Sequence, residues 1–146
     1  MHKLIIKGKR EISGKINISG SKNASLPILA ATILANKVKL TNIPLVQDIF
    51  TMSELLKFIG LKVKLIKKKN SIEVKNNKDN INTMAPYKLV KTMRAGVLVL
   101  GPLLAKYKKA KISLPGGCAI GSRPVNLHLF ALKKLGAKIK IKNGFI

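Results

Sequence analysis

The single cysteine of this 146-residue chain, Cys118, lies within the segment LPGGCAIGSRP, which spans residues 114–124. Three glycines within six residues predict a mobile loop that exposes the thiol. Arg123 and the start of a following helix both favour the thiolate form of such a cysteine. A thiol in this setting is suited to act as a nucleophile or a proton donor. The alternative is that Cys118 is a small buried apolar side chain, which is the commoner role of a lone cysteine.

Arginine is rare in this chain, because only Arg10, Arg94 and Arg123 among its 29 basic residues are arginines. Two of them, Arg94 and Arg123, lie close to the candidate chemistry in the sequence. The planar guanidinium binds phosphate or carboxylate through two parallel hydrogen bonds, which lysine cannot do. Arg94 and Arg123 are therefore candidate anion-binding residues, and an ordinary packed or surface role is the equally weighted alternative.

A third candidate is the pair Lys22-Asn23, which follows Gly20-Ser21 and precedes an apolar run that predicts a helix. Backbone N–H groups at the start of a helix favour an anion, and the Lys22 ammonium adds a point charge. The alternative is simple capping of the helix by Ser21 or Asn23. The segment matches neither a P-loop nor a dinucleotide-binding motif.

Groups that could carry a second proton are scarce. No Asp or Glu occurs from Asn80 to Ile146, so the candidates in this chain are Asp48, Glu54 and His128, and the last is more simply a helix-face histidine. A base from outside these residues is the other possibility. Two histidines and one cysteine predict neither a metal site nor a cofactor.

The charge of the chain is strongly positive, with a formal net charge of +24 and a pI near 10.6. Such values invite the hypothesis of a small basic nucleic-acid-binding protein, which we keep as an alternative. Aromatic residues for base stacking make up only 4% of the chain, however. The lysines alternate with apolar residues, as in residues 62–65 and 138–141, which is typical of the solvated face of half-buried strands. We therefore expect no nucleic-acid partner, although the positive field would attract an anionic substrate.

The sequence also predicts the compartment. One cysteine excludes an internal disulfide, and the longest apolar runs are shorter than the roughly 18–20 residues that span a membrane. The charged N-terminal residues do not form an export signal. We expect a cytoplasmic protein without a membrane partner.

Hydrophobic patterning predicts an α/β protein. The predicted strands are Lys3–Lys7, Gly14–Ser19, Lys37–Thr41, Lys62–Ile66, Ser71–Val74, Lys111–Leu114 and Lys138–Ile141. The predicted helices are a buried one over Ala24–Ala35, an amphipathic one over Asp48–Ile59 ended by Gly60, a long one over Pro86–Tyr107 broken at Gly101-Pro102, and one over Pro124–Leu135 stopped by Gly136.

A repeat relates the two halves of the chain. Residues 56–65 and 132–141 share the order of helix, glycine and alternating strand at an offset of 76. In the second copy the expected return strand is cut short at Ile146. The repeat predicts units that bury their apolar faces against one another, and its incomplete second copy predicts a fragment of a longer protein.

Three segments resemble one family, the bacterial UDP-N-acetylglucosamine enolpyruvyl transferases. They are ISGSKNA (residues 18–24), PYKLVKTMRA (86–95) and LPGGCAIGSRPVNLH (114–128). The Cys118 segment is the most specific, because the sibling enolpyruvyl transferase of the shikimate pathway lacks such a loop. The resemblance implies an inside-out α/β barrel of repeated βαβαββ units, of which this chain is the incomplete N-terminal third. It implies that residues 1–21 are strands of the other, mostly absent lobe. Residues 22–146 would then form part of the lobe that bears the Cys118 loop.

The reaction that the resemblance implies is transfer of enolpyruvyl from phosphoenolpyruvate to the sugar 3′-hydroxyl, with release of phosphate through a tetrahedral ketal. This is the first committed step of peptidoglycan synthesis, and so belongs to cell-wall biogenesis, cell shape, cell division and the cell cycle. By resemblance, Lys22 and Asn23 contact substrate at the phosphoenolpyruvate site and Arg94 binds an anionic substrate group. Cys118 protonates the methylene carbon and is the target of fosfomycin. The residues implied to line the UDP-sugar site are Arg123, Pro124, Val125, Asn126 and Leu127.

The chain departs from the family pattern at two positions. Asn126 stands where the family usually has Asp, and Gly96 stands where Ser is common. The family's catalytic Asp and further arginines belong to the missing remainder, so we expect this chain to be inactive alone. A non-catalytic remnant of the enzyme is the second alternative.

Overall fold

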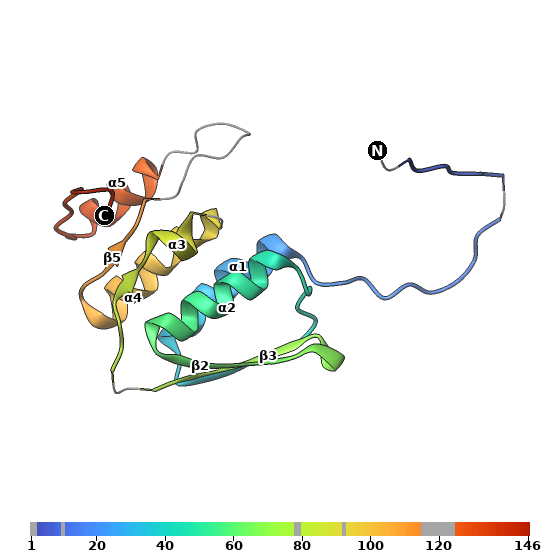
Figure 1. Cartoon of the computed structure of the whole chain (residues 1–146), viewed down its shortest axis with the longest axis horizontal. Coiled ribbons are helices and arrows are strands. Elements are labelled where there is room, and N and C mark those ends of the chain that lie inside the picture. Colours follow the sequence, from blue (N-terminus) through green and yellow to red (C-terminus); the bar gives the residue numbers. More distant parts are fainter. Residues whose placement is uncertain (1–2, 10, 78–79, 92, 115–124) are drawn as a thin grey trace.

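The folded part of the chain contains a three-stranded antiparallel sheet covered by two helices, with the remaining helices and a two-stranded parallel sheet beside them (Figure 1). The computed structural model describes residues 3–9, 11–77, 80–91, 93–114 and 125–146. The α-helices are α1 (Lys22–Ala31), α2 (Gln47–Ile59), α3 (Tyr87–Val90), α4 (Leu100–Tyr107) and α5 (Asn126–Lys134). The strands are β1 (Lys37–Leu40), β2 (Leu61–Ile66), β3 (Ser71–Asn76), β4 (Met84–Ala85) and β5 (Lys111–Ile112). Short 3-10 helices cover Thr32–Leu34, Lys67–Lys69 and Arg94–Val99.

The larger sheet has the order β1-β3-β2, with both pairs antiparallel. Its register aligns apolar residues in cross-strand rows, one of which is Val38, Val74 and Val63. Lysines occupy the opposite, exposed face, and Glu73 lies between Lys39 and Lys64 in one of their rows. The alternation of lysine with apolar residues therefore predicted the two faces of this sheet correctly.

Helices α1 and α2 cover the apolar face of the sheet and pack against each other. In α2, the side chains of Ile49, Met52, Leu55, Leu56 and Ile59 are fully buried. Gly60 ends this helix as predicted, with a left-handed φ of 111° that an L side chain rarely adopts. The predicted burial of α1 is confirmed for one face only, because other apolar residues of this region, such as Ile28 and Leu34, are exposed.

The structure repeats this arrangement in the second half of the chain. Helix α4 corresponds to α1, β5 to β1 and α5 to α2, and Gly136 has a φ of 92° at the position that corresponds to Gly60. The final residues turn at Asn143-Gly144, and Ile146 exchanges two backbone hydrogen bonds with Ile112, of 2.9 and 2.8 Å. Its backbone thus pairs antiparallel with β5, as β3 pairs with β1.

Two sequence predictions about elements of the folded part were wrong. The strand predicted over Lys138–Ile141 is not formed, because the returning residues pair with the β5 side, at Ser113 and Phe145, and with Lys142 just after this segment. The long helix breaks before Arg94 rather than at Gly101-Pro102. Pro102 instead lies in the first turn of α4, where proline is tolerated.

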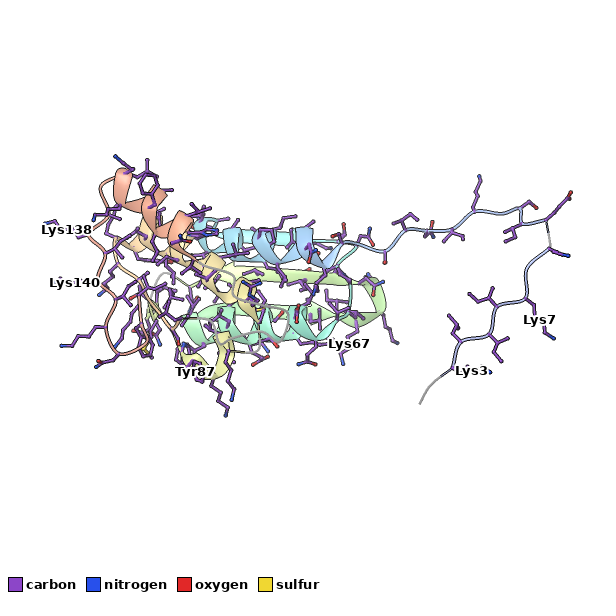
Figure 2. All side chains as sticks on the ribbon, turned by 90° about the horizontal axis from the view of Figure 1, so that it is seen from above. Lys3, Lys7, Lys67, Tyr87, Lys138 and Lys140 are labelled. Carbon is purple, nitrogen blue, oxygen red and sulfur yellow. The ribbon has the colours of Figure 1, made fainter. Side chains whose placement is uncertain are left out.

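The N-terminal segment is extended and separate from the folded part (Figures 1 and 2). The strands predicted at Lys3–Lys7 and Gly14–Ser19 are not formed, because no backbone ladder reaches the described residues of this segment. Ile12, Ile16 and Ile18 are each more than 80% exposed there. Alternating apolar residues make a strand only when a sheet edge is available to pair with them.

No helix among the described residues is both long enough and apolar enough to cross a membrane.

Candidate anion-binding site

The start of α1 is built by a side-chain cap. Ser21 has an extended backbone, and its hydroxyl accepts a hydrogen bond from the Ala24 N–H at 3.3 Å. Ser25, which is 4% exposed, adds a hydrogen bond from its hydroxyl to the Ser21 carbonyl at 2.8 Å. Of the two capping residues considered from the sequence, Ser21 is thus the one that caps. Lys22 and Asn23 follow immediately as the first two helical residues, and both are exposed.

Lys22 has a carboxylate partner. Its Nζ lies 2.9 Å from Oδ2 of Asp48, in the first turn of α2. The N-termini of α1 and α2 lie at the same end of the helical layer in Figure 1, so that this ion pair joins the two helix starts. A carboxylate in the first turn of a helix is favoured by the helix dipole, which helps hold Asp48 in place. Asp48 was predicted from the sequence as a candidate proton carrier, but its pairing with Lys22 was not predicted.

The segment that enters α1 is held by Asn42. Its Oδ1 accepts a hydrogen bond from the Gly20 N–H at 3.0 Å, and its Nδ2 donates to the Ile18 carbonyl at 3.3 Å. Sequence reasoning missed Asn42. The turn sequence TNIP (residues 41–44) is the signal that could have indicated Asn42. Asn tolerates a left-handed backbone, and Asn42 has a φ of 55°.

Arg94 is the first residue of the 3-10 helix Arg94–Val99, which packs against α1. Its side chain is partly buried and engaged in an interaction of its own. The structure therefore brings the element that bears Arg94 against the helix that bears Lys22.

The residues predicted to line the sugar site lie elsewhere. Val125 stands just before α5 and makes no side-chain cap, while Asn126 and Leu127 begin the helix and are exposed. Helix α5 lies beside the C-terminus, away from the start of α1 in both views (Figures 1 and 2). The structure does not bring these residues to Lys22. Cys118, Arg123 and Pro124 lie outside the described residues, as does the predicted loop that bears them.

The other two candidate proton carriers, Glu54 and His128, do not pair with Lys22. Glu54 is paired with Lys57 at 2.8 Å on the exposed side of α2. His128 is exposed on α5. Asp48 is therefore the one described candidate that contacts a predicted site residue. No group of three or more metal-ligating side chains occurs within the described ranges.

Two adjoining hollows lie between α4 and the segment that follows α5, with volumes of about 320 and 530 Å³. Leu104, Leu132 and Ala137 line both, together with lysine side chains. None of the predicted site residues that the structure describes lines either hollow. The two hollows reflect the looser packing of α5 on α4, compared with the close packing of α1 on α2.

The fold is that of an enolpyruvyl transferase. The chain superposes on the enolpyruvyl transferase NikO from Streptomyces tendae with a TM-score of 0.75 at 18% identity, over 91% of this chain and 29% of that one. The α/β class is thus confirmed, although the described residues form no closed barrel. Residues 6–146 match the family model of EPSP synthase (3-phosphoshikimate 1-carboxyvinyltransferase), and the chain belongs to this family.

Relatives within the family align with this chain over its whole length. It is 59% identical over 147 aligned residues to the UDP-N-acetylglucosamine 1-carboxyvinyltransferase of Pelagibacter ubique, and 52% identical to that of Rickettsia massiliae. All of this chain is covered in both cases, but only 34% and 35% of the relatives. The chain therefore spans about a third of the length of the curated relatives it matches.

Proposed function

We propose that this chain carries part of the active site of a UDP-N-acetylglucosamine 1-carboxyvinyltransferase. The observation that carries the proposal is the 59% identity, across the entire chain, to a relative with that name. The comparisons give no support to a nucleic-acid-binding protein. The substrates would be phosphoenolpyruvate and UDP-N-acetylglucosamine, and the reaction would serve peptidoglycan synthesis in the cytoplasm, and through it cell-wall biogenesis, cell shape and cell division.

In the proposed reaction the sugar 3′-oxygen bonds to the central carbon of phosphoenolpyruvate, while the methylene carbon takes a proton from the Cys118 thiol. The resulting tetrahedral ketal then loses phosphate, and a methyl proton returns to the Cys118 thiolate, which restores the double bond and the thiol. Both substrates are anionic, so cations that face them stabilise the charge of the intermediate. Lys22 and Arg94 supply cations from the described residues, and Arg123 would supply a third.

The hydroxyl proton of the sugar needs an acceptor. Asp48 and Glu54 are each already paired with a lysine, and His128 lies on α5, away from Lys22. By resemblance to the family, whose catalytic Asp belongs to the remainder of the protein, we propose that the acceptor comes from outside residues 1–146. The same proposal assigns residues 1–21 to a second lobe, which would supply the sheet edge that their exposed isoleucines lack. Residues 22–146 would be part of the lobe with the Cys118 loop.

The proposal is tested with a chimera in which residues 1–146 replace the matching third of the Pelagibacter ubique relative. We expect phosphate release that requires both substrates, and little or none from the 146-residue chain alone. The matched control is the same chimera with Cys118→Ala. A folded chimera that releases no phosphate would overturn the proposed activity and favour a non-catalytic remnant. Normal turnover by the chain alone would overturn the claim that it holds only part of the site.

A further inference from the structure

Asn42 holds the backbone ahead of Lys22 in the way that a neighbouring strand would. Its side-chain amide accepts from the Gly20 N–H and donates to the Ile18 carbonyl, at 3.0 and 3.3 Å. A backbone peptide group pairs with an adjacent strand through the same kinds of donor and acceptor. The Asn42 amide thus replaces a missing strand at the last residues before α1.

These two hydrogen bonds are also the attachment of the N-terminal segment. Within the described part of the chain, they are the only hydrogen bonds between residues 3–9 and 11–20 and the residues that follow Ser21. Figure 1 shows the segment leaving the folded part at this point. The direction in which the chain enters α1 is therefore set at Asn42.

The contact is close on the backbone side as well. A Cβ atom at Gly20 would lie 1.8 Å from the Asn42 carbonyl oxygen, so this approach requires glycine. Asn42 itself is fixed by the next residue, because the Ile43 N–H donates to the Asn70 carbonyl at 2.8 Å and Ile43 is 4% exposed. The Asn42 amide is therefore presented to the segment by a rigid part of the fold.

We propose that Asn42 is a positioning residue for Lys22 and Asn23. Its side chain fixes residues 18–20, and the Ser21 cap then fixes where the helix starts, so that the Lys22 ammonium and the first free N–H groups face a bound anion together. This inference rests on the proposed function, since it takes Lys22 and Asn23 as phosphoenolpyruvate contacts. Asn42 has no contact with substrate in this role and acts only through the backbone ahead of α1.

The test compares Asn42→Gly with Asn70→Gly. Both asparagines have a left-handed backbone, with φ of 55° and 43°, which glycine adopts without strain. Asn70 makes no side-chain hydrogen bond within the described residues, so its replacement controls for the change of backbone. Asn42→Asp is the third variant, because it keeps the acceptor for Gly20 and loses the donor to Ile18.

The first readout is hydrogen exchange at the Gly20 amide in the 146-residue chain. We expect protection there to be lost in Asn42→Gly and kept in Asn70→Gly and in Asn42→Asp. The second readout is the affinity for phosphoenolpyruvate, followed by the amide shifts of Lys22 and Asn23. We expect about tenfold weaker binding in Asn42→Gly, from the loss of a fixed hydrogen-bond geometry, and unchanged binding in Asn70→Gly.

Unchanged affinity in Asn42→Gly would overturn the positioning role, as would an unprotected Gly20 amide in the original chain. If the original chain shows no shifts with phosphoenolpyruvate, the proposed function loses its anion site. The Gly20 exchange then still decides whether Asn42 fixes the start of α1, so the two failures are distinguishable.

Discussion

The Nζ atom of Lys22 lies 2.9 Å from Oδ2 of Asp48, so the cation expected to bind substrate already has a carboxylate partner. The two side chains are 48% and 32% exposed. Ion pairs with this much exposure contribute about 0–1 kcal/mol, because water screens them. If Lys22 binds substrate as proposed, a phosphoryl group would share or displace the Asp48 carboxylate.

The first prediction concerns Asp48→Asn. Removing a negative charge beside the anion site relieves repulsion of roughly 1 kcal/mol at about 4 Å in water, which corresponds to about a fivefold change in affinity. We expect the 146-residue chain to bind inorganic phosphate more tightly by this factor, measured by calorimetric titration.

The matched control for that prediction is Glu54→Gln. It breaks a similar ion pair on the same helix, between Glu54 and Lys57 at 2.8 Å, without touching Lys22. Its phosphate affinity should equal that of the original chain. Weaker binding in Asp48→Asn would contradict the prediction and show that orientation of Lys22 outweighs repulsion.

The second prediction concerns the joint between the two repeats. The Lys106 ammonium on α4 donates to the carbonyls of Ile33 and Leu34, at 2.9 and 3.1 Å, and so satisfies the end of the α1 region. We expect Lys106→Met to lower the free energy of unfolding by about 1–2 kcal/mol, since two carbonyls lose a charged donor. Denaturant titration measures this. Lys109→Met, at an exposed lysine nearby, should change the stability little, and equal losses in both variants would refute the role of Lys106.

Local patterns predicted the parts of this fold that depend on local chemistry. The lysine–valine alternation gave the faces of β2, and Gly60 and Gly136 marked turns with left-handed backbone that glycine favours. The prediction of N-terminal strands was wrong because a strand also needs a sheet edge to pair with, and residues 3–7 contain no information about that edge. The helix break before Arg94 was missed for a related reason, because Gly101-Pro102 is locally the more obvious breaker.

In the candidate site, too, the sequence predicted the local features and missed the long-range ones. Ser21 and Lys22 were identified because a cap and a cation at a helix start are local features of the sequence. Asn42 and the Lys22–Asp48 pair join residues more than 20 positions apart, so they depend on how α1 and α2 pack. Sequence spacing alone does not encode that packing.

The third prediction concerns Gly96, which packs against α3. A Cβ atom there would lie 3.2 Å from Cγ2 of Val90, which is fully buried and has little room to move. We expect Gly96→Ala to destabilise the chain by about 1 kcal/mol through overpacking. Gly101→Ala is the control, because outside its own helix backbone and chain neighbours no atom lies within 4 Å of its Cβ position. It should change the stability by less than about 0.5 kcal/mol, since the helix propensity of alanine is offset by the crowding of its Cβ against Pro102. A stabilising Gly96→Ala would show that Val90 repacks freely.

The last prediction concerns Cys118, whose role as the fosfomycin target remains an expectation from the sequence. Its thiolate would open the fosfomycin epoxide and form a carbon–sulfur bond, which mass spectrometry detects as one adduct on a chain with one cysteine. We expect the adduct on the original chain and none on Cys118→Ala; an adduct that persists in this variant would refute the assignment.

Lys22→Met separates recognition of fosfomycin from the reactivity of the thiol. If Lys22 helps to bind the phosphonate, this variant should slow labelling by fosfomycin about tenfold while leaving alkylation by iodoacetamide unchanged, because the second reagent is uncharged. Equal rates with fosfomycin would place the Lys22 ammonium away from the thiol and undo the proposed site.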